Sequence, residues 1–148
     1  MESIWWYIFD IMGTLAFAVS GVLVAVSKRM DLFGIFVLAA STAIGGGIIR
    51  DLMLGHTPPI ALQSSLYFFL IIAAMLGTTA MIRYFDANIR SKVMHHSAYI
   101  YLAGDTIGLA SFTITGTLSG LYFNPDMWVL IIMLGVITAV GGGVIRDV

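Results

Sequence analysis

The chain is short of charge. Only 10% of its 148 residues are Asp, Glu, Lys or Arg, whereas a soluble domain carries about 25%. Cysteine is absent, which excludes a disulfide framework and a thiolate metal site. The formal net charge of -1 excludes the clustered basic face that nucleic acid needs. Walker loops, HExxH zinc motifs and nucleophile elbows are also missing, so the sequence predicts that the protein is not an enzyme.

Most of the chain is apolar. They make up 59% of the chain, and the mean hydropathy is +0.99. A globule of this size has too little interior to hide so many apolar side chains from water. The solvent must therefore be lipid, where a spanning segment has to satisfy its own backbone hydrogen bonds. We expect an all-α membrane protein.

The charged residues mark where the chain leaves the membrane. A helix needs about 20 mainly apolar residues to cross roughly 30 Å of hydrocarbon. One apolar run is too long for a single span, and the turn from His56 to Pro59 divides it. Five spans follow: residues 4 to 27, 32 to 55, 64 to 83, 98 to 122 and 127 to 147.

The basic residues predict the orientation. Those of the first and third loops fall on the same side of the membrane, and they are Lys28, Arg29, Arg83, Arg90 and Lys92. Loops rich in Lys and Arg stay in the cytoplasm. We therefore expect an inner-membrane protein with its N-terminus outside.

The chain also repeats itself. The segment from Thr42 to Asp51 recurs from Thr138 to Asp147 with only Ile and Val exchanged. A weaker echo matches Asp10, Gly13, Phe17, Ser20 and Gly21 with Asp105, Gly108, Phe112, Thr115 and Gly116. Three spans separate each element from its copy, so the second copy is inverted in the membrane. We predict a first three-helix unit at 4–86 and an incomplete second unit of two inverted helices at 98–148, an arrangement typical of transport proteins.

Each copy carries three consecutive glycines, and each glycine costs a helix about 1 kcal/mol relative to Ala. The triplets are Gly45, Gly46 and Gly47, and Gly141, Gly142 and Gly143. We expect a break or kink at both, although close packing of helices is the alternative. A break at membrane depth implies an aqueous pathway. Freed carbonyls and the hydroxyls of Ser41, Thr42 and Thr138 would there replace the hydration shell of an ion.

Ionisable residues inside the membrane need partners, because each costs about 2.5 to 3.5 kcal/mol at a helix centre. Asp10 and Arg50 fall at one end of the first unit, and inversion brings Asp105 and Arg146 together at the opposite end of the second. We predict both ion pairs. They are either charged vestibules of a pathway or structural locks between helices.

His95 and His96 are adjacent in the third loop, but they lack the carboxylate or Cys companions of a metal site. We predict a solvated loop there and no metal.

Three motifs together resemble the bacterial members of the trimeric intracellular cation channel (TRIC) family, which is also known as a glycine transporter domain. They are Gly13-Thr14-x-Ala16-Phe17-Ala18-x-Ser20-Gly21, the segment from Thr42 to Asp51, and Gly55-x-x-Pro58. The resemblance implies seven helices built from two inverted three-helix units plus one, and a homotrimer with a pore in each subunit. It also implies conduction of monovalent cations, chiefly potassium, beside kinks at the glycine triplets of the second and fifth helices. The sixth and seventh helices are missing here, so we expect a fragment.

The function predicted is a potassium-permeable channel subunit whose pathway is shaped by the glycine triplets. The alternative is a secondary transporter of a small zwitterion such as glycine, and a packing partner without transport is the third hypothesis. No cofactor is expected beyond the transported K+ or Na+, with a bound lipid left open. The expected partners are the lipid bilayer, further copies of the chain and monovalent cations, and not nucleic acid. The potassium filter Thr-Val-Gly-Tyr-Gly is absent, so strong selectivity of that type is not expected.

Overall fold

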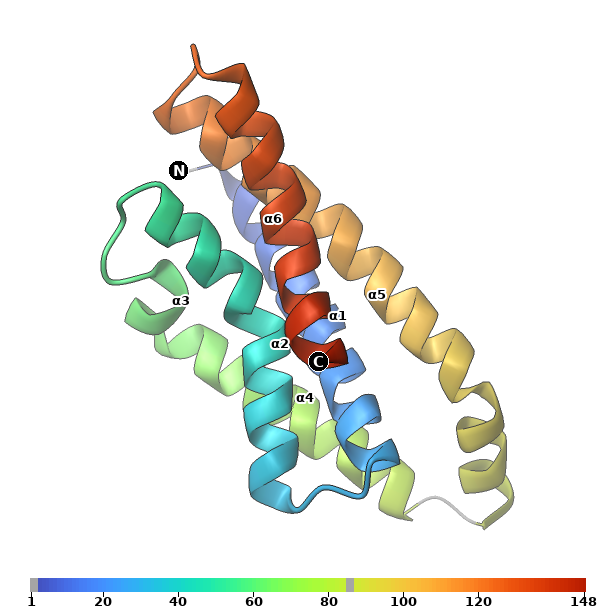
Figure 1. Cartoon of the computed structure of the whole chain (residues 1–148). Helices are drawn as coiled ribbons and strands as arrows, with labels where there is room; N and C mark the ends of the chain where they lie inside the picture. The colour runs from blue at the N-terminus through green and yellow to red at the C-terminus, as the bar shows by residue number, and fades with distance from the viewer. Residues whose placement is uncertain (1–2, 85–86) are drawn as a thin grey trace.

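The computed structural model describes residues 3–84 and 87–148, and the side chains of residues 87–97 lie outside the description. Within these ranges the chain forms a bundle of helices (Figure 1). The helices are α1 (Ile4–Ser27), α2 (Leu32–Met53), α3 (Ile60–Gln63), α4 (Ser65–Tyr84), α5 (Ala87–Phe123) and α6 (Trp128–Asp147). The all-α prediction is confirmed.

The helix boundaries follow local chemistry. The carboxylate of Asp31 accepts a hydrogen bond from the Gly34 N–H at 2.8 Å and so caps the start of α2. The predicted turn lies between α2 and α3. The short helix α3 was not predicted, and Asp51 holds its first residue by accepting a hydrogen bond from the Ile60 N–H at 2.8 Å.

The third loop is where the prediction is wrong. α5 begins at Ala87, whereas the sequence was expected to form a solvated loop until residue 98. Charged residues stop a membrane span, but Arg, Lys and Ala favour helix and let it continue beyond the apolar segment. The side chains of Arg90, Lys92, His95 and His96 lie outside the description.

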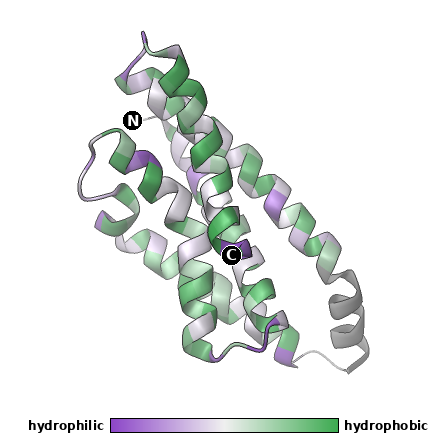
Figure 2. Ribbon diagram, viewed as in Figure 1, coloured by the Kyte–Doolittle hydropathy of each residue, from purple (hydrophilic) through white to green (hydrophobic). Residues whose placement is uncertain are grey.

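The surface suits lipid. Large apolar side chains such as Phe33 and Val129 are 73% and 77% exposed, and hydrophobic residues occur along the length of the helices (Figure 2). In the described part of the chain, α1, α2, α4 and α6 are long and apolar enough to cross a membrane. Four of the five predicted spans are thus supported by this criterion, while α5 covers the remaining one as a continuous helix.

The order of the helices brings the two repeats face to face. α1 packs against α2, α4 and α5, and α6 packs against α2 and α5. α1 and α5 run in opposite directions, as do α2 and α6 (Figure 1). Where α1 meets α5, the Phe112 ring lies against Gly13 and the Phe17 ring against Gly108. This reciprocal contact is what an inverted repeat predicts.

Candidate functional site

Arg50 lies near the end of α2 and is 2% exposed. Its Nη1 donates to Asp10 Oδ1 on α1 at 3.1 Å, and its Nε donates to Asp51 Oδ1 at 2.8 Å. Tyr67 on α4 donates its hydroxyl to the other oxygen of Asp10. The guanidinium also lies over the Trp6 ring, 4.9 Å from its centroid. These five residues form the Arg50 cluster, which joins α1, α2 and α4 and confirms the predicted Asp10–Arg50 pair.

Arg146 holds the corresponding position near the end of α6. Its Nη1 donates to Asp105 Oδ1 on α5 and its Nε to Asp147 Oδ1, both at 2.8 Å. The same Nη1 donates to the Ser20 hydroxyl on α1 at 2.7 Å. The Tyr101 ring lies 4.4 Å below the guanidinium. These residues form the Arg146 cluster, and the predicted Asp105–Arg146 pair is also confirmed.

The two clusters differ in the exposed fraction of their acidic side chains. In the Arg50 cluster the side chains of Asp10 and Asp51 are 5% and 0% exposed. In the Arg146 cluster Asp105 is 22% and Asp147 is 58% exposed. The first arginine therefore neutralises two buried carboxylates, while the second neutralises two carboxylates that are more exposed.

The glycine triplets lie where α2 and α6 cross. A Cβ on Gly46 would lie 2.1 Å from the Thr138 carbonyl oxygen, and one on Gly142 would lie 2.2 Å from the Thr42 carbonyl oxygen. The middle glycine of each triplet therefore lets one helix backbone touch the other. Gly46 faces Thr138 and Gly142 faces Thr42, so the two helices are antiparallel. Arg50 and Arg146 therefore lie on opposite sides of the crossing.

The predicted interruption of these helices is wrong, whereas a kink at the triplets stays a prediction. The α-helix is continuous through both triplets, although α2 changes direction midway in Figure 1. Close contact with a second backbone makes the glycines useful without interrupting either helix. The alternative that was kept open, close packing, describes Gly45, Gly46, Gly141 and Gly142.

The third glycine of each triplet has another neighbour. The nearest atom to a Cβ on Gly47 would be Arg50 Nη2 at 3.7 Å, and for Gly143 it would be Arg146 Nη2 at 3.6 Å. These are ordinary van der Waals distances. Each third glycine thus faces the arginine of its own helix. The contact between α2 and α6 therefore adjoins both arginine clusters.

The predicted pathway hydroxyls are only partly available to an ion. Thr42 is buried and its hydroxyl donates to the Leu38 carbonyl at 2.7 Å, within its own helix. Thr138 is also buried, and its hydroxyl has no hydrogen-bond partner among the residues described. Ser41, directly before Thr42 on α2, is half-buried. A role in ion passage remains a prediction for all three.

A small cavity adjoins the Arg50 cluster. Its volume is about 10 Å³, and Asp10, Thr14, Gly47, Tyr67 and Phe112 are among its lining residues. That volume holds roughly one water molecule. At this point the space between the helices is nearly closed, and its walls carry a carboxylate, two hydroxyls and a guanidinium.

Sequence reasoning missed several members of the clusters. Trp6 and Tyr101 stand four residues before Asp10 and Asp105, so the repeat itself carried the signal for these two rings. Trp6 is fixed by its Nε1, which donates to the Ser119 hydroxyl at 3.1 Å. Asp51 was known only as part of the repeated motif, and nothing in the sequence pointed to Tyr67.

Comparison with known proteins identifies the relatives of this chain. Residues 7–83 and 102–148 match the family model described as Glycine transporter. A UPF0126 membrane protein of Vibrio cholerae is 43% identical over 142 residues, which cover 96% of this chain and 56% of that protein. The UPF0126 inner membrane protein YadS of Escherichia coli is 38% identical over 143 residues, or 96% of this chain and 64% of that protein. The chain thus spans little more than half of the Vibrio relative.

Solved structures give the same answer for the fold. The TRIC trimeric intracellular cation channel orthologue from Rhodobacter sphaeroides superposes with a TM-score of 0.81 at 33% identity, covering 96% of this chain and 68% of that one. A structure described in connection with conductance through TRIC cation channels gives a TM-score of 0.71 at 40% identity, covering 95% of this chain and 64% of that one. The motifs that suggested the resemblance therefore predicted the fold correctly.

Proposed function

The chain belongs to the TRIC cation channel family, and on that premise we propose that it is a channel subunit permeable to potassium, with a pathway inside each protomer. The observation that carries the proposal is the pair of arginine clusters on opposite sides of the glycine crossing. Polar groups this deep in apolar helices are costly, and in membrane proteins they mark ion pathways. The pathway would run along the α2 and α6 crossing, with one cluster near each end.

In this arrangement the Arg50 cluster would close the pathway. Its side chains are buried, and the cavity beside it holds about one water molecule. Conduction would require the cluster to loosen. The Arg146 cluster, with Asp147 58% exposed, would be the open vestibule.

The proposal includes the assembly and the setting. The two inverted units at 4–86 and 98–148 would belong to one protomer, and three protomers would form a homotrimer. The protein would lie in the inner membrane with its N-terminus outside, because Lys28, Arg29 and Arg83 lie on one side of the predicted spans. Channels lower a barrier to ion movement, so no enzymatic activity is proposed.

A secondary transporter of a small zwitterion such as glycine is the second candidate, favoured by the name of the matching family model. Planar-bilayer recording of the purified protein separates the two. A channel gives unitary potassium current in the absence of any substrate. A transporter gives saturable glycine uptake into vesicles without such current, and a packing protein gives neither result.

A further inference from the structure

Trp6 connects the Arg50 cluster to a helix of the other repeat. The Arg50 guanidinium lies 4.9 Å from the centroid of its ring. Its Nε1 donates to the Ser119 hydroxyl at 3.1 Å and to the Thr115 carbonyl at 3.3 Å, and both acceptors belong to α5. The Trp6 side chain is 2% exposed, and a buried indole N–H needs such an acceptor. One side chain of α1 therefore contacts the arginine of α2 and is fixed to α5.

The acceptors on α5 are themselves held in place. Ser119 and Thr115 are buried, and the Ser119 hydroxyl donates to the Thr115 carbonyl at 2.7 Å. Residues four apart lie on one face of a helix, and Phe123 continues this face. Its ring lies against the His56 ring, with 4.3 Å between the ring centroids. The end of α5 thus contacts the first repeat at two places, Trp6 and His56.

The second contact leads back to the same cluster. The His56 N–H donates to the Asp51 carbonyl at 2.8 Å, and the Asp51 carboxylate accepts from Arg50 Nε. Phe112, further back on α5, lines the small cavity beside Arg50. α5 therefore lies along the Arg50 cluster, and a shift of α5 would move the groups that hold the arginine.

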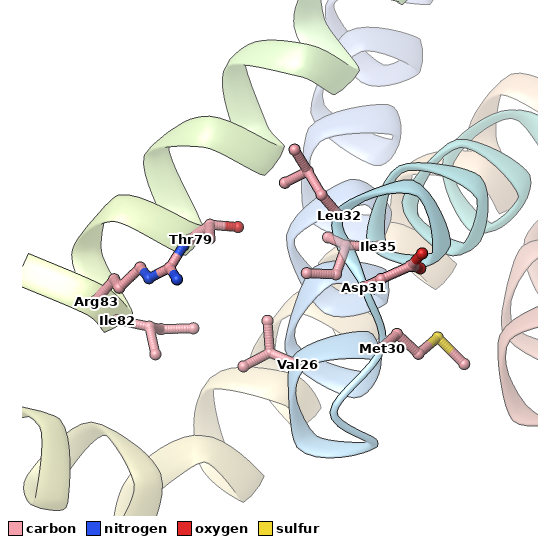
Figure 3. A pocket seen from close by; sticks show the side chains of 8 residues that line it. All are labelled: Val26, Met30, Asp31, Leu32, Ile35, Thr79, Ile82 and Arg83. Carbon is pink, nitrogen blue, oxygen red and sulfur yellow. The ribbon is translucent and has the colours of Figure 1, made fainter.

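The opposite end of α1, α2 and α4 is less closely packed. A pocket of about 440 Å³ separates the helices there, with Thr79 and Ile82 on the side of α4 and Val26 and Ile35 on the side of α1 and α2 (Figure 3). At the Arg50 cluster the cavity between the helices is only about 10 Å³. The three helices therefore meet closely at the Arg50 cluster, and contacts that hold this cluster decide how closed that end stays.

The equivalent ring of the Arg146 cluster is held differently. The Tyr101 hydroxyl donates to Asp147 Oδ1 at 3.3 Å, so this bond stays within its own cluster. The N–H of Trp6 is instead directed at α5, the helix of the other repeat. Both rings lie against an arginine, but the bond from Trp6 links its arginine cluster to a helix outside that cluster.

We propose that Trp6 is a positioning residue of the channel, because its N–H bond to α5 holds the indole against Arg50 and so keeps the Arg50 cluster closed. The inference rests on the proposed function, in which this cluster closes the pathway. Hydrogen bonds that lock the rotamer of a neighbouring residue hold a functional group in position. Trp6 is not among the residues that line the small cavity, so it acts through Arg50 and not on the ion. Breaking the bond should raise the open fraction and leave the unitary conductance unchanged.

Planar-bilayer recording in potassium measures the open fraction and the unitary conductance separately. Ser119→Ala removes one acceptor and leaves the indole intact, and the Thr115 carbonyl at 3.3 Å remains, so the ratio of open to closed channels should rise about threefold. Trp6→Phe removes the donor and should raise this ratio about tenfold. Ser119→Thr keeps the hydroxyl and should stay close to the wild type. Adding Ser119→Ala to Trp6→Phe should change little more, since both break the same bond.

A labelling measurement separates this inference from the proposed function. The chain has no cysteine, so Thr14→Cys places one thiol on the wall of the small cavity, where Thr14 is 1% exposed. Aminoethyl methanethiosulfonate reacts with an accessible thiol, so the rate of labelling reports opening of the cluster. In this background Ser119→Ala and Trp6→Phe should raise the rate by the same factors as above. A wild type without unitary current would refute the channel, while the labelling rates would still test Trp6.

Trp5→Phe is the matched control. It makes the same change at the neighbouring position, where the side chain is 64% exposed, and it should leave the open fraction and the labelling rate unchanged. Unchanged labelling in Ser119→Ala and Trp6→Phe would overturn the proposal, as would an equal rise in Trp5→Phe. A lower thermal midpoint without faster labelling would give Trp6 a purely structural role and would also overturn it. If Trp6→Phe does not fold, the comparison of Ser119→Ala with Ser119→Thr decides.

Discussion

Replacing Arg50 by Gln should be one of the most damaging single changes in the chain. Arg50 neutralises Asp10 and Asp51, whose side chains are 5% and 0% exposed. Its removal leaves two buried carboxylates without a cation, and breaking a buried pair in this way costs about 3 to 5 kcal/mol. Asp10→Asn is milder, because Arg50 keeps its 2.8 Å contact with Asp51 and the amide oxygen can still accept a hydrogen bond. We expect that variant to lose about 1 to 3 kcal/mol.

A double-mutant cycle measures the coupling between the two residues. The free energies of unfolding of the wild type, Asp10→Asn, Arg50→Gln and the double variant are obtained in mixed micelles from helical circular dichroism. Because the side chains touch, the double variant should lose less than the sum of the single losses, by about 0.5 to 3 kcal/mol. Potassium current through the same four proteins shows whether the pair also lies on the pathway.

The second repeat supplies a matched comparison. Arg146→Gln removes the same charge from an equivalent position, but Asp105 is 22% and Asp147 is 58% exposed. Water can solvate the carboxylates that remain, so this loss should be clearly smaller than for Arg50→Gln. Equal losses at the two arginines, or additive losses for Asp10 and Arg50, would refute the reasoning. Coupled stability with unchanged current would assign the Asp10–Arg50 pair to structure alone.

Two further predictions concern the crossing and the orientation. Gly46→Ala and Gly142→Ala should each cost about 1 to 3 kcal/mol of unfolding free energy, because the added methyl group forces the helices apart. In Gly47→Ala the nearest atom to the new methyl group would lie at an ordinary contact distance of 3.7 Å, so this change should be neutral or stabilising by up to about 1 kcal/mol. Thermal unfolding measures both effects, and equal effects at 46 and 47 would contradict the packing role. In intact cells, an impermeant thiol reagent applied from outside should label a cysteine replacing Ser3 and leave one replacing Ser91 unlabelled, and the opposite pattern would reverse the proposed orientation.

The sequence determined the helices and one contact in each cluster. Apolar length set the spans, because lipid allows a single segment little choice but helix. The repeated motif then paired Asp10 with Arg50 and Asp105 with Arg146, since inversion places equivalent helix ends together. The apolar pattern could not predict where α5 begins, because the residues from 87 to 97 lie outside the apolar run but still favour helix.

Only the tertiary structure decided what the glycines and arginines touch. A triple glycine weakens a helix and also permits close packing, and the distance from Gly46 to the Thr138 carbonyl selects the second effect. Neighbours in a helix seldom face one another, so the contact between Arg50 and Asp51 depends on a rotamer fixed by Trp6 and the helices around it. Tyr67 reaches Asp10 from α4, which carries no motif of the repeat. Such contacts depend on where a third helix packs, and no local pattern in the chain encodes that position.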